Sequence, residues 1–371
     1  MASAQTYSRD NPPQTLCLLR LSALGDITHV LPTLRTLQKH WPQTKITWII
    51  GKTEYQLVKE IEGVHFIIFD KAAGLASYRE LKRQLKDHLE GGKFDVLLHM
   101  QLSIRASVAS LFIPAKIKLG FDRARAKDMQ SLFCNRQIKP DSIRQHVLDS
   151  FLEFPRYFGL DPVFEWRLPV SRVAVDNIKK RLATDKRLFV INPCAVAKSK
   201  SWRNWHAEGY AAIADLVCDR HDMQVALTGG NSSLETEMAE KILSLCNSAE
   251  PLNLIGKTGI DEMVAVLQLA DIVLAPDTGP VHIASALGTD TIGLYAATNP
   301  DRAGPYNYQS FVVNRYPQAL LKYNNTTVEE ASWGERVRTA ESMDLITVDD
   351  VATQIENIIR TSHQVEKQHD T

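Results

Sequence analysis

An acidic residue follows the first apolar run of this sequence at the point where a helix is expected to begin. The motif RLSALGD at residues 20–26 overlaps the end of a strand-like run at 15–21. Ligands of open α/β sheets collect at the carboxyl ends of parallel strands, where a carboxylate can take a proton from a hydroxyl group. The sequence therefore predicts Asp26 as a catalytic base, with helix capping as the alternative because Asp is a good N-cap residue.

A second motif in the other half of the chain is suited to an anion. The sequence PDTGPVH at residues 276–282 follows an apolar run and precedes a helix of small residues that ends at Gly288. The free N–H groups and the dipole at a helix N-terminus favour a phosphate. We therefore predict that Asp277, Thr278, Gly279 and His282 bind a diphosphate, and the alternative is a well-capped helix start.

Two further loops are expected at the same sheet edge. The loop at 192–202 carries Lys198 and Lys200, and lysine is a good point-charge partner for phosphate. A Gly-Gly-Asn turn at 229–231 leads into a helix that carries Glu235, and a carboxylate at this position can hold ribose hydroxyls. Taken singly, each lysine could be solvated and Glu235 could satisfy the helix dipole. The convergence of three loops favours nucleotide binding.

Basic side chains gather at or after strand ends in the first half of the chain. Arginine suits bidentate capture of carboxylates and phosphates, so this group predicts an anionic acceptor. Its alternative is that the turn at 123–127 is a solvated basic turn. The predicted acceptor-binding residues are Arg20, Arg105, Arg123, Arg125 and Lys127.

No metal-binding motif appears in the sequence. There is no Asp-x-Asp motif and no cluster of His, Cys and carboxylate residues with the spacing of metal ligands. The dinucleotide fingerprint GxGxxG is also missing from the first turn. We therefore expect a mechanism that uses neither a metal nor a cofactor, in which Lys, His and helix N-termini neutralise the diphosphate.

The elements that position these residues alternate between apolar strands and helices. Such a pattern predicts parallel sheets covered on both faces, and the pattern restarts after 159–171. We expect two doubly wound, Rossmann-like α/β domains facing each other across a cleft, at 1–171 and 172–346, followed by a terminal helix and tail at 347–371. The stretch 316–345 is predicted to be a long ordered loop. The predicted strands are 15–21, 45–50, 64–69, 94–99, 188–192, 223–228, 252–255, 271–275 and 291–295.

Composition narrows the class of protein. The chain has 371 residues with 43 basic and 43 acidic side chains, which argues against a nucleic-acid binder driven by overall charge. Its five cysteines contain no Cys-x-x-Cys pair, so a reducing compartment is expected. The N-terminus has no apolar signal-peptide core. We predict a cytoplasmic protein, soluble or peripheral at the inner face of the inner membrane.

These motifs resemble the lipopolysaccharide heptosyltransferases of glycosyltransferase family 9, of the heptosyltransferase I type. The resemblance rests on RLSALGD at 20–26, the Gly-Gly loop, the Lys-Ser-Trp loop at 200–202 and DTGPVHIASALG at 277–288, and it spans about 15–315. It implies the two-domain GT-B fold, an inverting and metal-independent reaction, ADP-heptose as donor and the anionic Kdo of lipid A as acceptor. It also implies Asp26 as base, and donor binding by Lys200 or Lys198, by Glu235 and by the turn from Asp277 to His282.

Two departures from the family and three other functions remain open. The loop at 192–200 lacks the hydroxyl-rich sequence of better-known members, which leaves the lysine assignment open. The segment at 333–336 (Trp-Gly-Glu-Arg) indicates a variant branch that acts on phosphorylated Kdo. A nucleotide-sugar epimerase would release nucleotide without an acceptor, and a silent nucleotide-binding module would not depend on Asp26. A glycosyltransferase with another donor sugar is the third alternative.

Overall fold

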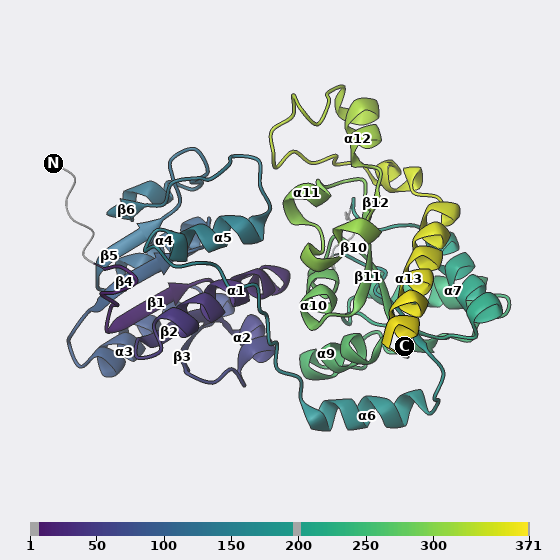
Figure 1. Cartoon of the computed structure of the whole chain (residues 1–371), viewed down its shortest axis with the longest axis horizontal. Helices are drawn as coiled ribbons and strands as arrows, with labels where there is room; N and C mark the ends of the chain where they lie inside the picture. Colours follow the sequence, from purple (N-terminus) through teal and green to yellow (C-terminus); the bar gives the residue numbers. More distant parts are fainter. Residues whose placement is uncertain (1–6, 196–201, 370–371) are drawn as a thin grey trace. The chain divides into compact units, whose positions relative to one another are not determined.

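The computed structural model describes residues 7–195 and 202–369, and the chain divides into two compact units, Met1–Pro169 and Val170–Thr371 (Figure 1). Each unit contains one sheet of six parallel strands, as the continuous apolar strands predict. The α/β fold class is therefore confirmed. The terminal helix α13 (Val348–His369), expected to follow the second domain, packs into the core of the second unit through Val351, Ile355 and Ile358.

The sheet of the first unit has the strand order β3-β2-β1-β4-β5-β6. Its central strand β1 pairs in parallel with β2 on one side and with β4 on the other, so the order of the strands reverses direction between β1 and β4. Ligands of open α/β sheets bind at the carboxyl ends of the strands beside such a switch point. The strands are β1 (Thr15–Leu19), β2 (Lys45–Gly51), β3 (Val64–Phe69), β4 (Phe94–His99), β5 (Ala115–Gly120) and β6 (Arg136–Gln137).

Helices connect these strands and bury their apolar sides on the sheet. Helix α1 alone buries eleven residues and packs against α5, and the core beneath α3 and α4 includes Leu19, Leu81 and Leu97. The helices are α1 (Leu24–His40), α2 (Lys52–Val58), α3 (Ala76–Leu89), α4 (Ile104–Leu111) and α5 (Val147–Arg156).

The sheet of the second unit repeats the same topology, with the order β12-β11-β10-β7-β8-β9 and a switch point between β7 and β10. Two groups of helices cover it: α9 contacts α6 and α10, whereas α7 contacts α8 and α13 (Figure 1). The strands are β7 (Leu188–Ile191), β8 (Gln224–Leu227), β9 (Leu252–Asn253), β10 (Ile272–Pro276), β11 (Asp290–Tyr295) and β12 (Val313–Asn314). The helices are α6 (Arg172–Leu182), α7 (Ala207–His221), α8 (Ser233–Leu245), α9 (Ile260–Leu269), α10 (Gly279–Leu287), α11 (Pro300–Ala303) and α12 (Tyr316–Ala319).

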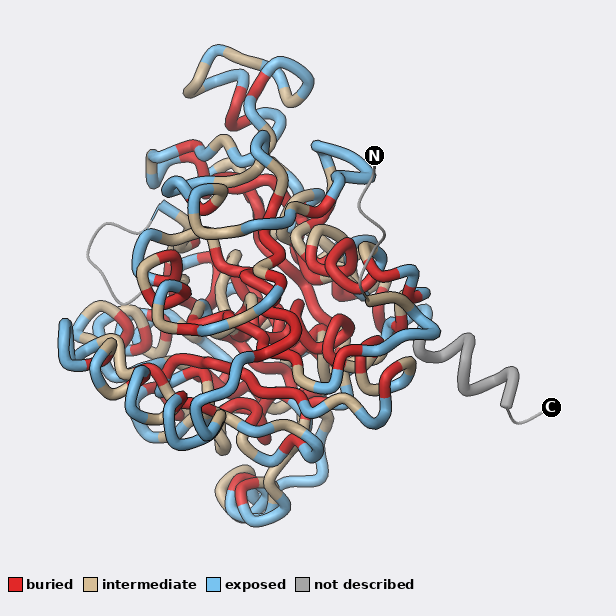
Figure 2. Tube along the Cα trace, turned by 90° about the vertical axis from the view of Figure 1, so that its left-hand side faces the viewer, coloured by how far each residue is buried: buried red, intermediate tan, exposed pale blue. Residues whose placement is uncertain are grey.

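Burial follows the strands and the inward sides of the helices, and exposure follows the connecting loops (Figure 2). The stretch 316–345, expected to be a loop, contains three short helical segments: α12, a π-turn at Leu320–Asn324 and a 3₁₀ turn at Ala340–Leu345. Tyr316, Leu320 and Val337 from this stretch are buried in the second core. Their burial explains why a segment without strong periodicity is ordered.

Candidate active site

The predicted base lies at the switch point of the first sheet. Asp26 is the third residue of α1, and its carboxylate accepts a hydrogen bond from the N–H of the N-cap residue Ala23 at 3.2 Å. The Arg20 guanidinium forms an ion pair with the same oxygen, Oδ2, at 2.5 Å. Within the described residues no hydrogen bond or ion pair reaches Oδ1, and the side chain is 35% exposed. Asp26 therefore contributes to the helix cap through Oδ2, while Oδ1 has no partner among the described residues.

Arg20 is held inside the fold rather than exposed to a ligand. Arg20 is only 8% exposed. Its Nη1 donates a hydrogen bond to the Met100 carbonyl oxygen at 2.7 Å, and its guanidinium lies 5.0 Å from the centre of the Phe151 ring. Because Met100 follows β4, this contact joins the two loops that flank the switch point. Binding of an acceptor by Arg20 stays a prediction. The ion pair instead indicates that Arg20 orients the carboxylate of Asp26.

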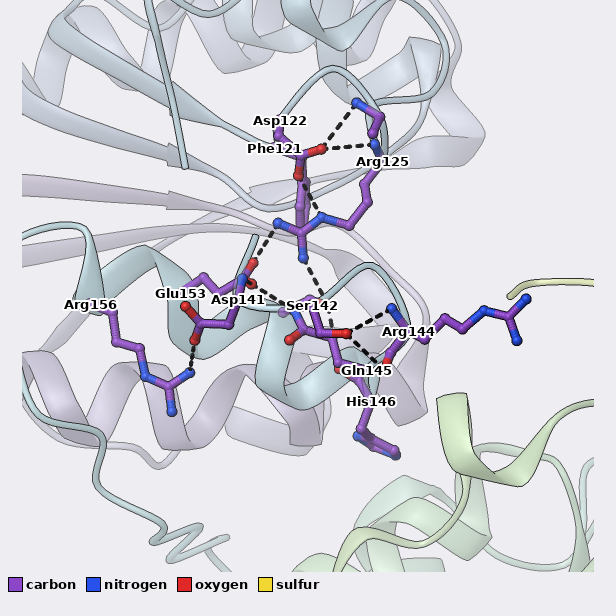
Figure 3. A network of polar contacts seen from close by, with 12 residues as sticks. Phe121, Asp122, Arg125, Asp141, Ser142, Arg144, Gln145, His146, Glu153 and Arg156 are labelled. Carbon is purple, nitrogen blue, oxygen red and sulfur yellow. Dashed lines mark hydrogen bonds and ion pairs between the residues drawn. The ribbon is translucent and has the colours of Figure 1, made fainter. Parts of the chain in front are cut away.

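The other predicted acceptor residues fall into two groups. Arg125 is largely buried, and its guanidinium pairs with Asp122 and with Glu153, each at 2.5 Å (Figure 3). Glu153 also accepts hydrogen bonds from the Asp141 N–H and from the Gln145 side chain, each at 2.7 Å. This network ties the two ends of the segment 122–145, which contains β6, to α5. Arg125 therefore has a structural role in this segment.

Arg105, Arg123 and Lys127, by contrast, are exposed. Among the residues that the structure describes, no side-chain hydrogen bond or ion pair occupies these three cations. Arg123 and Lys127 belong to the loop that the Arg125 network holds, and Arg105 is the second residue of α4. These three cations therefore remain available for an anionic partner.

The predicted diphosphate turn lies at the switch point of the second sheet. Asp277 follows β10, and its carboxylate is 3.2 Å from Nη1 of Arg203 and 3.6 Å from Nε2 of His282. Burial alone would raise the pKa of Asp277, but the hydrogen bond from His282 and the charges of Arg203 and His282 lower this pKa to about 2. Asp277 is thus a carboxylate that is charged at neutral pH and holds Arg203 and His282 in place.

The N-terminus of α10 lacks a side-chain cap. Thr278 is its N-cap residue, yet the Thr278 hydroxyl donates to the Ala195 carbonyl oxygen at 3.3 Å rather than capping the helix. Pro280 has no N–H, so the first turn presents the N–H groups of Gly279 and Val281 without a capping side chain. A helix start of this kind favours an anion through its N–H groups and its dipole.

Glu235 makes structural contacts of its own. One carboxylate oxygen accepts from the Gly230 N–H at 2.7 Å, and the other accepts from the Ser232 hydroxyl at 2.6 Å. The second oxygen also accepts from the Ser232 N–H at 3.3 Å, and the Glu235 N–H donates to the Ser232 hydroxyl oxygen, which together form a capping box at the start of α8. A Cβ at position 230 would lie 2.9 Å from this carboxylate, so a larger residue there would have to displace the Glu235 side chain. Ribose binding by Glu235 stays a prediction.

Arg203 is the functional candidate that the sequence reading missed. Lys198 and Lys200 lie outside the described residues, whereas Arg203 belongs to the same loop and donates to both the backbone oxygen and the carboxylate of Asp277. Its position in the Lys-rich loop after β7 could have indicated a role in the donor site. Strand β7 pairs with β10 at the switch point, so this loop and the turn after β10 start from neighbouring strands.

The described part of the chain contains neither a metal-binding cluster nor a membrane-spanning helix. Within residues 7–195 and 202–369, no three His, Cys, Asp or Glu side chains are grouped as a metal site would require. No helix in that part is long and apolar enough to cross a membrane.

Comparison with known proteins decides the family. Residues 82–331 match the family described as glycosyltransferase family 9 (heptosyltransferase). The lipopolysaccharide core heptosyltransferase OpsX of Haemophilus influenzae is 37% identical over 347 residues, which is 93% of this chain and 97% of that protein. The chain belongs to glycosyltransferase family 9. As a family 9 member it is a glycosyltransferase, and the resemblance inferred from its motifs is confirmed.

Solved family 9 structures share the fold. A family 9 glycosyltransferase from Veillonella parvula superposes with a TM-score of 0.77 at 19% identity, covering 94% of this chain and 97% of that one. The Escherichia coli ADP-heptose lipopolysaccharide heptosyltransferase II gives 0.72 at 19% identity, covering 94% and 99%. At this identity the likeness concerns the fold alone, and it confirms two Rossmann-like units of the GT-B type.

Proposed function

We propose that this family 9 enzyme transfers heptose from ADP-heptose to a Kdo residue, phosphorylated or not, of the lipid A inner core in lipopolysaccharide biosynthesis. The near full-length likeness to OpsX supports the role as a core heptosyltransferase. The donor named for the E. coli enzyme supports ADP-heptose. The observation that carries the proposal is the open Oδ1 of Asp26 at the switch point of the first sheet.

The proposed reaction is a single displacement with inversion. Asp26 accepts the proton of an acceptor hydroxyl through Oδ1 while that hydroxyl oxygen bonds to the anomeric carbon of the heptose. The bond between the anomeric carbon and the diphosphate oxygen breaks on the opposite face, and ADP leaves with the electron pair. Arg20 holds Oδ2 at 2.5 Å, so the carboxylate keeps its orientation while Oδ1 reacts.

The donor site is proposed at the switch point of the second sheet. The start of α10 offers N–H groups to the diphosphate, and Arg203, fixed by Asp277, adds a cation beside them. His282 is held by the same carboxylate. Lys198, Lys200 and Glu235 complete the proposed donor set. Together these groups would stabilise the negative charge that develops on the leaving ADP.

Nucleotide release measured with and without acceptor tests this function. Purified protein is incubated with ADP-heptose, and in parallel with ADP-glucose, each with and without a Kdo-lipid A acceptor. We expect ADP only when ADP-heptose and the acceptor are both present. Release from ADP-heptose without acceptor would favour an epimerase, and equal use of ADP-glucose would reject the donor assignment.

Substitutions in the two units should separate donor binding from acceptor binding. In the proposed donor complex the Thr278 hydroxyl donates to the diphosphate instead of the Ala195 carbonyl oxygen. Thr278→Ala is therefore expected to weaken ADP binding by about 1.5–2 kcal/mol, at the lower end of the range for a hydrogen bond to a charged group. Arg123→Ala is expected to raise the KM for the acceptor and leave ADP affinity unchanged, and Arg123→Glu should raise the KM further by repulsion. Calorimetric ADP titration and acceptor-dependent kinetics measure the two effects.

Matched variants control this comparison. Thr278→Ser keeps the hydroxyl and should bind ADP like the unmodified enzyme. Arg172→Ala removes an exposed arginine from α6, outside both proposed sites, and should change neither ADP affinity nor the KM for the acceptor. Loss of ADP binding in Arg123→Ala together with unchanged binding in Thr278→Ala would reverse the roles assigned to the two units.

Chelation should leave the reaction intact. In the proposed mechanism the cations and helix dipole of the chain itself neutralise the diphosphate, so excess EDTA is expected to change kcat by less than about twofold. A metal-dependent glycosyltransferase assayed in the same buffer provides the control. Complete loss of activity that added Mg²⁺ or Mn²⁺ restores would contradict this part of the mechanism.

A further inference from the structure

Helix α4 exposes its large apolar residues and buries its small ones. Ala106, Ser107, Ala109 and Ser110 are buried against the first unit. Ile104 is 49% exposed and Leu111 is 63% exposed, and their spacing of seven residues places them on one side of the helix. A surface helix normally turns its aliphatic side chains toward the core. The outward side of α4 is therefore an apolar surface.

The turn at 127–132 adds two more apolar side chains that the fold keeps exposed. Gln130 is fully buried and donates to the carbonyl oxygens of His99 at 2.8 Å and Gln101 at 3.2 Å. On either side of this anchor, Met129 is 62% exposed and Leu132 is 76% exposed. Because Gln130 fixes the turn, these two side chains cannot withdraw into the core without breaking buried hydrogen bonds.

A hydrogen bond joins the turn to the helix. The Ile104 N–H donates to the Asp128 carboxylate at 3.1 Å, which brings the start of α4 beside Met129. The four apolar side chains, Ile104, Leu111, Met129 and Leu132, are here named the docking face. Of the available cations, Arg105 directly follows Ile104 in the sequence, and Lys127 and Arg123 precede Met129 by two and six residues. An apolar surface accompanied by cations is typical of a site that binds anionic lipid.

We propose that the docking face binds the surface of an anionic lipid bilayer. This inference rests on the proposed function, in which the acceptor sugar is attached to a lipid embedded in a membrane. The apolar side chains would enter the boundary between headgroups and acyl chains, and Arg105, Arg123 and Lys127 would pair with the acidic headgroups. The chain has a formal net charge of +0, so this attraction is local to the face.

Charge also argues against a second copy of the chain as the occupant. A two-fold symmetric dimer would bring the same surface patch of both copies together. Arg105, Arg123 and Lys127 of one copy would then approach the same three cations of the other copy, which is unfavourable. An anionic bilayer carries the complementary charge.

Sedimentation with vesicles tests the proposal. Full-length protein is mixed with phosphatidylethanolamine vesicles prepared with or without phosphatidylglycerol. We expect binding to the anionic vesicles that falls by about tenfold or more in Met129→Ser/Leu132→Ser. Arg105→Gln should weaken the binding by about fivefold. Leu321→Ser removes a side chain that is 62% exposed in the second unit and should bind like the unmodified protein.

Activity provides a second readout that separates this proposal from the proposed function. Met129→Ser/Leu132→Ser is expected to keep its turnover on a water-soluble, deacylated acceptor and to lose turnover on the acceptor embedded in anionic vesicles. Undiminished vesicle binding by this variant would contradict the proposal that the docking face binds the bilayer. The proposal would also be contradicted if the unmodified protein formed a dimer and only this variant were monomeric. Failure of the unmodified enzyme to use either acceptor would instead count against the proposed function, while vesicle binding would still decide the docking face.

Discussion

Asp26→Asn is expected to lower kcat by about 10²–10⁴, the usual contribution of a general base, and to leave ADP affinity nearly unchanged. Asparagine has the size of aspartate and its amide oxygen can still accept the hydrogen bond from the Ala23 N–H, so α1 should keep its start. What the variant loses is the oxygen that takes the proton. Rapid-quench kinetics with saturating ADP-heptose and acceptor measure the chemical step.

The control is another aspartate in the first turn of a helix, at a position with no proposed catalytic role. Asp349 is an exposed acidic residue in the first turn of α13, and Asp349→Asn should keep the kcat of the unmodified enzyme. Turnover by Asp26→Asn at the level of this control would remove Asp26 from the mechanism and leave it with the helix cap alone.

Asp277→Asn is expected to lower the free energy of unfolding at neutral pH by about 2–3 kcal/mol, because a carboxyl pKa held near 2 rather than near 4 contributes about that much stability. The pKa of Asp277 is about 2 in the folded protein. Since the folded pKa is the lower one, this stability is present above about pH 4 and is lost as the pH falls toward 2. Urea unfolding at several pH values measures it.

An exposed ion pair at the opposite end of β10 gives a matched comparison. Asp271 directly precedes β10 and pairs with Arg187 at 3.2 Å, but both side chains are more than a third exposed. Asp271→Asn should therefore cost less than about 1 kcal/mol. Equal losses in the two variants, or a loss in Asp277→Asn that persists below pH 2, would show that the charge of Asp277 is not what stabilises the turn.

The parts of the fold that the sequence predicted are those with continuous apolar strands. The runs at 45–50, 64–69 and 94–99 correspond to β2, β3 and β4, because each run is mostly apolar. Strands β2 and β4 are buried along nearly their whole length, whereas the edge strand β3 is only partly buried. Strand β5 was missed because Lys116 and Lys118 alternate with its apolar residues. Lys118 is half-buried and its ammonium donates to the Ser110 carbonyl oxygen at 2.6 Å, an arrangement that sequence periodicity does not reveal.

The candidate site was predicted where a motif coincides with the end of a strand. Asp26 and the turn from Asp277 to His282 are predicted in this way, because the position of a loop and the types of its residues can both be recognised in a sequence. The sequence did not predict that Arg125 is buried in an ion-pair network while Arg123 is exposed. The partner that distinguishes the two arginines, Glu153, lies about 30 residues away in the sequence. Arg203 was missed for a similar reason, since its partner Asp277 comes from a strand much later in the chain.

The most direct test of the account is the structure of the product formed from ADP-heptose and Kdo-lipid A. Mass spectrometry of the acceptor, followed by NMR of the new glycosidic linkage, gives both the transferred group and its anomeric configuration. We expect the unmodified enzyme to form an acceptor heavier by one heptose residue, with anomeric configuration opposite to that of the donor. With Asp26→Asn this product should be nearly absent. An acceptor of unchanged mass, or a heptose linked with retained configuration, would contradict it.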